Sequence, residues 1–400
     1  MAAFPTIRTY PEALESFWQD EARAVTRCSD LGGALEKLEP AVQMLSDLFT
    51  VARPEKFRDY GADALQRTAY GLFYFPQSFV RVGFPLAELL DVRGWRPDTS
   101  GIRILDLGAG LGACGLGAAR VIRSRGFTQP ITLDALDHSP AKLAVLGKVA
   151  MTACADYQPL TLRTHPGDLR KAENLLDRHG PYDLILCGFA LNEACAGKPV
   201  EQSAALVNTW LRALKPGGVL LILEPALQPT ARALAALGDF ILASKRCVRL
   251  APYAGTHPDP LTADRFHWSH EVRRWTIPES LRFLNRHLWR DLDVLKFSFL
   301  ALTANPDAFT PLPKPTNEHF RLISPFSLMK GRFLATGVGT DGLVYTYDLP
   351  TRGMEKPEIQ AHEAIERGDL LTVNDLVALG SERTYRIPKA SAILNRHGIE

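Results

Sequence analysis

The stretch Ile102-Arg-Ile-Leu-Asp-Leu-Gly-Ala-Gly-Leu-Gly-Ala-Cys-Gly, residues 102 to 115, decides the fold of this chain. A short apolar strand ends near Asp106, a turn follows through Gly108, Gly110 and Gly112, and a helical pattern begins directly afterwards. Glycine permits positive φ and leaves main-chain N–H groups open to a ligand, while the helix directs its positive end to the same place. The order of strand, glycine turn and helix therefore predicts a loop that holds a polar small molecule.

The carboxylate at the end of this strand narrows the choice of ligand. Asp106 would repel a pyrophosphate, but it suits a cofactor whose amino-acid end carries positive charge. This favours S-adenosylmethionine over a nicotinamide dinucleotide. A purely structural glycine turn and a degenerate, empty cofactor site are the alternatives.

Strand-like and helical segments alternate after this stretch. We expect strands at 131–136, 160–164, 182–189 and 219–223, and helices at 141–152 and 200–214, the last ending at a Lys-Pro-Gly-Gly stop. Alternation of this kind favours an α/β fold with a doubly wound parallel sheet that binds ligands at the carboxyl ends of its strands.

Polar residues and glycines follow several of these strands. A carboxylate at Asp137 would accept hydrogen bonds from both ribose hydroxyls, or it would cap the next helix. Asp134 is the other candidate, but strand alternation places it at an interior or edge position, and Asp168 also fits a plain turn. The expected cofactor-binding residues are Asp106, Gly108, Ala109, Gly110, Gly112, Asp137, His138, Asp168, Leu169, Gly188 and Phe189. Asn192 and Glu193 would orient or deprotonate a nucleophile, or would only cap a helix or close the loop.

Length and composition indicate a soluble protein of several parts. The 400 residues are 46% apolar and 22% charged with a net charge of +2, so they can form a large core and do not by themselves indicate nucleic acid. The six cysteines are scattered without a C-x-x-C pair, which indicates reduced thiols in the cytoplasm. No apolar run is long enough to cross a bilayer, so we expect no membrane association.

The chain is expected to contain three regions. Residues 1–95 form a helical region, broken at Pro76 and Pro85, whose aromatic cluster covers the ligand or packs on the sheet. Residues 96–304 form the cofactor-binding domain, and 316–400 form a small β-rich domain with an OB-like barrel as one candidate.

An irregular segment at 245–275 is rich in basic and aromatic residues. It is a candidate substrate-facing or RNA-facing surface, or a solvated loop with aromatic anchors. The residues concerned are Arg246, Arg249, Arg265, Arg273, Arg274, Tyr253, Phe266, Trp268 and Trp275.

Beyond the generic features, a series of short landmarks is similar to a known family. They are Tyr74-Phe-Pro-Gln-Ser-Phe, Ala190-Leu-Asn-Glu, Leu223-Glu-Pro, Leu250-Ala-Pro, Phe266-His-Trp-Ser-His-Glu, Leu295-Lys-Phe-Ser-Phe-Leu and Gly339-Thr-Asp-Gly. With the glycine loop, they resemble class I S-adenosylmethionine-dependent methyltransferases, and most closely the methyltransferase-like proteins of the (mitochondrial) small ribosomal subunit and their bacterial relatives. The resemblance implies a Rossmann-like fold and methyl transfer to, or docking on, small-subunit ribosomal RNA.

The resemblance also implies four cysteines that hold an iron–sulfur cluster. This chain has Tyr253, Asp259, Ser269 and Gly339 at those positions, so we expect no cluster. His257, His267 and His270 lie nearby, but their spacing matches no standard zinc site, so we expect no metal. A methyltransferase for a small molecule or protein, and a non-catalytic assembly factor, remain as alternative functions.

Overall fold

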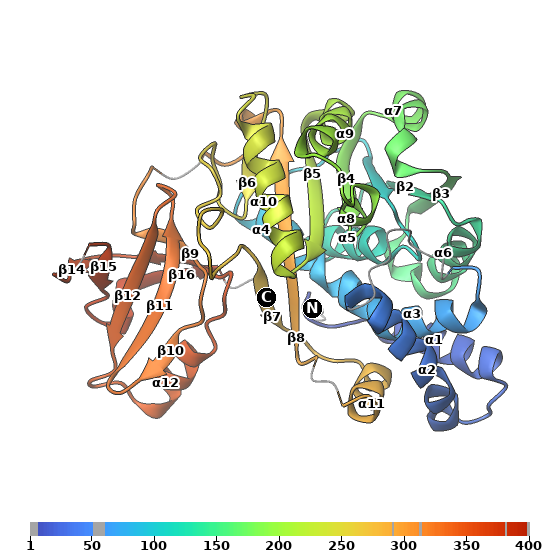
Figure 1. Ribbon diagram of the computed structural model, residues 1–400, viewed down its shortest axis with the longest axis horizontal. Coiled ribbons are helices and arrows are strands. Elements are labelled where there is room, and N and C mark those ends of the chain that lie inside the picture. Colours follow the sequence, from blue (N-terminus) through green and yellow to red (C-terminus); the bar gives the residue numbers. More distant parts are fainter. Residues whose placement is uncertain (1–6, 51–60, 290–291, 312–313, 381, 398–400) are drawn as a thin grey trace. The chain divides into compact units, whose positions relative to one another are not determined.

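The computed structural model describes residues 7–50, 61–289, 292–311, 314–380 and 382–397. The chain divides into two compact units (Figure 1). Unit 1 comprises Met1–Leu86, Arg96–Leu223 and Arg274–Leu295, and unit 2 comprises Ala87–Trp95, Glu224–Arg273 and Lys296–Glu400. The three-region division drawn along the sequence stays a prediction. No helix among the described residues is long and apolar enough to cross a membrane.

Unit 1 contains parallel strands in the order β3-β2-β1-β4-β5. Their bounds are β1 (Ile102–Leu107), β2 (Ile131–Asp137), β3 (Leu160–Pro166), β4 (Tyr182–Gly188) and β5 (Leu214–Pro225). Most residues of β1 and β4 are buried, as expected for a parallel sheet covered on both faces. The chain runs outward from β1 to β3 and then returns to add β4 beside β1, so the topological switch point lies between β1 and β4. The predicted α/β fold with a Rossmann-like sheet is confirmed.

Helices connect these strands: α5 (Ala113–Ser124), α6 (Pro140–Ala153), α7 (Glu173–His179), α8 (Leu191–Ala194) and α9 (Val200–Arg212). The helix expected at 200–214 ends at Arg212, and Lys215-Pro-Gly-Gly lies in β5 rather than in a turn after the helix. The Lys215 Nζ atom lies 2.9 Å from Asp183 Oδ2 and 3.1 Å from Asp98 Oδ2. These two ion pairs bind the start of β5 to Asp183 of β4 and to Asp98.

Helices also precede the sheet: α1 (Glu12–Thr26), α2 (Leu31–Thr50), α3 (Ala64–Arg81) and α4 (Gly83–Asp91). The predicted break at Pro76 was wrong, because α3 runs through it. Proline removes one helical hydrogen bond, but the helix buries a long apolar face on which Phe75 and Phe79 stack with ring centroids 6.1 Å apart. The predicted break near Pro85 is present, because α3 ends at Arg81 and α4 begins at Gly83; Pro85 lies in the first turn of α4, where a missing N–H is tolerated.

Unit 2 begins its β-structure inside the segment that the sequence indicated to be irregular. Here β6 (Val248–Ala251) pairs antiparallel with the end of β8 (Val294–Thr303), and β7 (Glu271–Arg274) also belongs to this segment. Helix α10 (Gln228–Leu242) approaches β8 closely, since a Cβ on Gly238 would lie 3.3 Å from Leu300. The remaining helix, α11 (Glu279–His287), belongs to unit 1.

The end of the chain forms a second sheet in the order β14-β15-β12-β11-β9-β13-β16, with β10 on β11. The bounds are β9 (His319–Leu322), β10 (Ser327–Met329), β11 (Arg332–Gly339), β12 (Val344–Pro350), β13 (Leu370–Val373), β14 (Val377–Ala378), β15 (Thr384–Arg386) and β16 (Ile393–His397), with helix α12 (Lys356–Glu363). Phe320 stacks on Tyr347 with centroids 3.7 Å apart, at the centre of an apolar core that includes Phe333 and Leu371. The predicted β-rich character of this region is confirmed (Figure 1).

A network of buried charges links three segments within unit 2. Arg321 on β9 binds Glu88 on α4 and lies 3.0 Å from Glu271 on β7. Arg273 lies 2.7 Å from Glu271 and 2.5 Å from Asp369. Burial alone would lower the pKa of Arg321, but its carboxylate partners raise that pKa above the ordinary value. Each charge in this network therefore has an opposite charge beside it, as buried charges require.

Candidate functional site

The glycine loop forms a tight turn at the carboxyl end of β1. Gly108, Gly110 and Gly112 all have positive φ, and the N–H groups of Gly108 and Ala109 donate to the Leu136 carbonyl at 2.8 and 2.9 Å. A Cβ on Gly112 would collide with Leu146 of α6, whereas a Cβ on Gly110 would meet nothing within 4 Å. Gly112 is therefore required by packing, whereas the space that a side chain at Gly110 would occupy is open.

Asp106 is the buried charge below this loop. It is 1% exposed, and its Oδ2 accepts a hydrogen bond of 2.8 Å from the Gly115 N–H in the first turn of α5. Burial raises the pKa of Asp106 to about 7; the hydrogen bond from Gly115 opposes this shift, and the nearby Asp137 adds to it. A cation bound beside Asp106 would offset the energetic cost of burying its carboxylate and would reduce its repulsion with Asp137.

Asp137 fastens the glycine loop to the end of β2. Its Oδ2 accepts from the Gly110 N–H and its Oδ1 from the Ser139 N–H, both at 2.9 Å. The exposed His138 side chain lies 3.5 Å from the same carboxylate. The helix cap of α6 is Ser139 rather than Asp137. Asp137 thus positions the loop, and its remaining lone pairs are the ones left for a ribose.

The other two aspartates are bound to neighbouring side chains. Asp134 is fully buried in β2, where its Oδ1 lies 2.8 Å from His165 Nε2, so it occupies the interior one of the two positions expected from strand alternation. Asp168 accepts from the Arg170 N–H at 2.9 Å and forms an ion pair with its guanidinium at 2.6 Å. This is the turn geometry that the sequence offered as the alternative for Asp168. Leu169 reaches the loop, because a Cβ on Gly108 would lie 3.3 Å from its Cδ2.

The end of β4 lies beside the glycine loop. A Cβ on Gly188 would collide with the thiol of Cys114 in α5, so β4 and α5 approach closely here. Phe189 has a φ of +61° and its N–H donates to the Leu223 carbonyl at 2.8 Å. Asn192 in α8 is half-buried and its amide lies 3.4 Å from the Phe189 carbonyl, while Glu193 is exposed. This contact closes the loop after β4, which is one of the alternatives to a catalytic role that the sequence left open for Asn192.

Arg81, the last residue of α3, was missed by sequence reasoning. Its guanidinium carbon lies 5.5 Å from the centroid of the Phe189 ring, and its Nη2 donates to Gln77 Oε1 at 2.9 Å. Burial lowers the pKa of Arg81 to about 10, opposed by Tyr70, Cys114 and Tyr74. The only sequence signal was the spacing of four residues between Gln77 and Arg81 on one helix.

The predicted aromatic cluster packs helices together. Tyr74 contacts Phe49 of α2 with ring centroids 5.0 Å apart, and Phe49 also contacts Tyr70 at 6.3 Å. These edge-on contacts join α2 to α3, so this part of the cluster packs one helix on another.

The irregular basic segment is partly interior. Arg249, Arg273, Tyr253 and Trp275 are buried, which is contrary to their expected place on a surface. Arg246, Arg265 and Phe266 are exposed, and Phe266 retains 81% of its accessible surface. Arg232 fixes this exposed turn by donating to the carbonyls of Asp264 and Arg265 at 2.6 and 2.9 Å. The exposed part of the candidate RNA-facing surface therefore includes Arg246, Arg274 and the short turn around Phe266.

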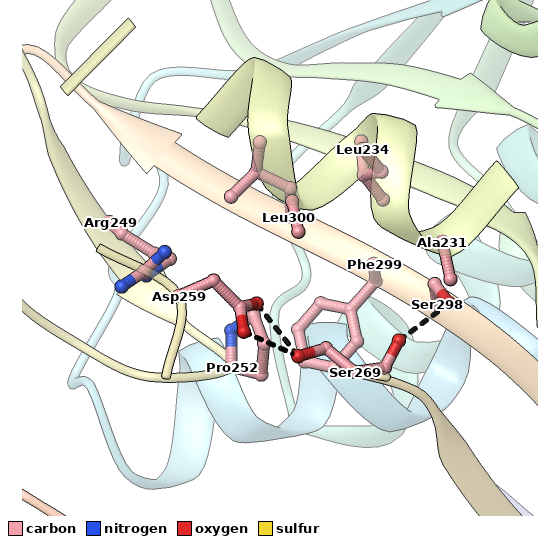
Figure 2. A pocket seen from close by; sticks show the side chains of 10 residues that line it. Ala231, Leu234, Arg249, Pro252, Asp259, Ser269, Ser298, Phe299 and Leu300 are labelled. Carbon is pink, nitrogen blue, oxygen red and sulfur yellow. Dashed lines mark hydrogen bonds between the residues drawn. The ribbon is translucent and has the colours of Figure 1, made fainter. Parts of the chain in front are cut away.

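Three of the four positions at which the sequence resemblance implies cysteines, those of Tyr253, Asp259 and Ser269, are buried here. The Ser269 hydroxyl lies 2.7 Å from both oxygens of Asp259 (Figure 2), and Tyr253 is buried beside Val338, the neighbour of Gly339. Burial raises the pKa of Asp259, opposed by Ser269. The cavity beside them measures about 10 Å³, enough for about one water molecule.

The nearby histidines each bind a separate partner. His257 Nδ1 lies 2.9 Å from the Pro258 carbonyl, His267 contacts Asp264 at 3.1 Å, and His270 Nδ1 lies 3.0 Å from the Trp268 carbonyl. Within the described residues no cluster of three or more His, Cys, Asp or Glu side chains has the geometry of a metal site.

The chain matches no protein-family model, and no curated protein matches it. Several solved structures are similar to it in fold. A class I S-adenosylmethionine-dependent methyltransferase of Listeria monocytogenes, described as putative, is 16% identical with a TM-score of 0.37, covering 75% of this chain and 83% of that one. A precorrin-6y C5,15-methyltransferase of Geobacter metallireducens is 13% identical with a TM-score of 0.33, covering 56% and 88%. TrmN of Thermus thermophilus is 24% identical with a TM-score of 0.27, covering 39% and 42%. These low TM-scores indicate a similar fold and do not indicate what this chain does.

Proposed function

We propose that this protein binds S-adenosylmethionine in the crevice between β1 and β4 and acts as a methyltransferase on, or docks to, small-subunit ribosomal RNA. The cofactor assignment rests on one observation, the burial of the Asp106 carboxylate below the glycine loop. A buried carboxylate below a glycine loop disfavours the phosphates of a dinucleotide and favours an ammonium group.

The residues present fit such a cofactor. Asp106 would accept from the ammonium of the methionine part, Gly110 gives the ligand access to the main chain, and Asp137 offers acceptors to a ribose. When bound, S-adenosylmethionine supplies a methyl group on a sulfonium centre. The protein's part is to hold the acceptor in line with that methyl group, a task in which proximity provides much of the rate. Asn192 and Glu193 are the side chains that follow β4 and would orient or deprotonate the acceptor.

The RNA assignment rests on the ordered landmarks shared with the ribosome-associated methyltransferase-like proteins. The exposed turn that carries Arg265 and Phe266 supports it, since a cation beside a free aromatic ring is suited to stacking on an unpaired base.

The test is calorimetric titration with S-adenosylmethionine of the wild-type protein and of the variants Asp106→Ala, Asp137→Ala and Asp177→Ala. Asp177 is an exposed carboxylate on α7 and serves as the charge control. We expect micromolar binding, about −8 kcal/mol, that Asp106→Ala abolishes and Asp177→Ala retains. Absence of binding to the wild-type protein would refute the cofactor assignment.

Tritiated methyl transfer to small-subunit ribosomal RNA, with salt-dependent gel shifts, then tests the acceptor. Transfer to this RNA supports the proposal. Binding to the RNA without transfer would leave a non-catalytic assembly factor, and transfer only to other molecules would refute the RNA target.

A further inference from the structure

The last turn of α3 packs against the start of α5, directly after the glycine loop. A Cβ on Gly117 would lie 2.5 Å from the Phe79 carbonyl oxygen, so the two helices approach at this glycine. One turn earlier, the Cys114 thiol lies 3.9 Å from the Ser78 carbonyl. Because α3 ends at Arg81, this packing carries its guanidinium to the carboxyl ends of β1 and β4.

Arg81 is a cation without an opposite charge. Among the described residues, no carboxylate lies within ion-pair distance of it, and its Nε is shielded from solvent without a hydrogen-bond partner. The groups that hold it are neutral: the amide of Gln77 and the ring of Phe189. By contrast, Arg273 and Arg321 of unit 2 are each bound to carboxylates. An unpaired, shielded guanidinium beside Phe189, the residue after β4, is therefore suited to binding an anion.

Arg81 and Asp106 both lie near one side chain, that of Cys114. Burial raises the pKa of the Cys114 thiol; the charge of Asp106 raises it further and that of Arg81 lowers it. Both charges are thus close to Cys114, the second residue of α5. The crevice presents one negative and one positive group that are not paired with each other, an arrangement complementary to a zwitterionic amino acid.

We propose that Arg81 binds the α-carboxylate of the methionine part of S-adenosylmethionine, while Asp106 binds the ammonium group on the same carbon. The proposal rests on the proposed cofactor. It assigns to α3, which precedes the Rossmann-like sheet in the sequence, a positioning role in cofactor binding. Arg81 and Asp106 together hold the α-carbon of the amino acid, and this anchors the methionine part that carries the sulfonium.

The experiment compares two ligands that differ only in this carboxylate, S-adenosylmethionine and its decarboxylated form. Dissociation constants are measured by calorimetry for the wild-type protein and for Arg81→Met. The control is Arg120→Met, because Arg120 also lies over an aromatic ring, that of Phe79 at 5.8 Å, but donates to the Thr9 carbonyl.

We expect the wild-type protein and Arg120→Met to bind S-adenosylmethionine about 10- to 100-fold more tightly than the decarboxylated ligand, the range for charged hydrogen bonds. Arg81→Met is expected to bind both ligands about equally. If Arg81→Met does not fold, Arg81→Gln, whose amide can still reach Gln77, replaces it.

A preference for the carboxylate that survives in the Arg81 variant would overturn the assignment. Equal binding of the two ligands by the wild-type protein would overturn it without any variant. If Arg81→Met keeps the preference for S-adenosylmethionine but no longer binds RNA, Arg81 binds a phosphate of the RNA instead. If the wild-type protein binds neither ligand, the proposed cofactor itself fails, which is a different result from any of these.

Discussion

Two neighbouring glycines of the loop are predicted to fail in different ways when they are replaced by alanine. Gly110 and Gly112 have φ values of +56° and +87°, so either substitution places a Cβ in a left-handed conformation that costs about 1–2 kcal/mol. At Gly110 the new methyl group meets nothing within 4 Å, whereas at Gly112 it collides with Leu146. Such overpacking costs about 1–3 kcal/mol more. We therefore expect Gly112→Ala to lower the free energy of unfolding by about 2–5 kcal/mol and Gly110→Ala by about 1–2 kcal/mol.

Binding should show the reverse order at temperatures where both variants are folded. The methyl group of Gly110→Ala would occupy the space left for the ligand, so we expect affinity for S-adenosylmethionine to fall by about tenfold or more, which is about 1.4 kcal/mol. Urea unfolding monitored by circular dichroism gives the stabilities, and calorimetry gives the affinities. Wild-type affinity in Gly110→Ala would refute the placement of the ligand against this glycine. Equal stability of the two variants would refute the packing argument at Leu146.

Three further predictions concern buried groups. Gly368→Ala, at a φ of +98° and directly against a carboxylate of the buried ion network, should destabilise the protein by about 3–5 kcal/mol in urea unfolding, whereas Gly353→Ala, at +86° with open space around it, should cost only about 1–2 kcal/mol. The pKa of Asp106 rises from 3.8 to about 7 on folding, so the free energy of unfolding should decrease as the pH rises through this range. The decrease between pH 4 and 7 should be about 4 kcal/mol, since about 3 pH units correspond to 1.36 kcal/mol each. Asp106→Asn should abolish this pH dependence in unfolding curves. Ser269→Ala removes a donor from the buried Asp259 and should cost about 1–3 kcal/mol; an unchanged midpoint would contradict a role of this hydrogen bond in stability.

The local features of the fold could be predicted from the sequence because they are local in origin. The alternation of strands and helices, and the glycine turn after β1, depend on patterns within a few residues. Where the sequence was misleading, contacts between distant residues decided the structure. Pro76 lies inside a helix because its neighbours are buried, and Lys215 lies in a strand because Asp98 and Asp183 bind it there.

The sequence indicated individual residues of the candidate site but not the hydrogen bonds and ion pairs that they form. The sequence indicated that Asp106 and Asp137 would lie at strand ends, but not that Asp137 already accepts two main-chain hydrogen bonds, one from Gly110, 27 residues away. Likewise, Arg273 looks like one more cation of a basic segment in the sequence. Only the fold shows that it is 1% exposed and bound to carboxylates.

The buried charges of unit 2 are paired, whereas those of Asp106 and Arg81 in unit 1 are not, and we expect the two sets to have different roles. In unit 2, Arg321, Arg273 and their carboxylates neutralise one another, so removing one partner is expected to damage stability and to leave ligand binding in the crevice intact. In unit 1, Asp106 and Arg81 each bear the energetic penalty of burial without an opposite charge beside them. A folded protein gains nothing from that arrangement by itself. A zwitterionic ligand would remove both penalties together, and its binding energy would then depend on the two residues as a pair rather than as a sum.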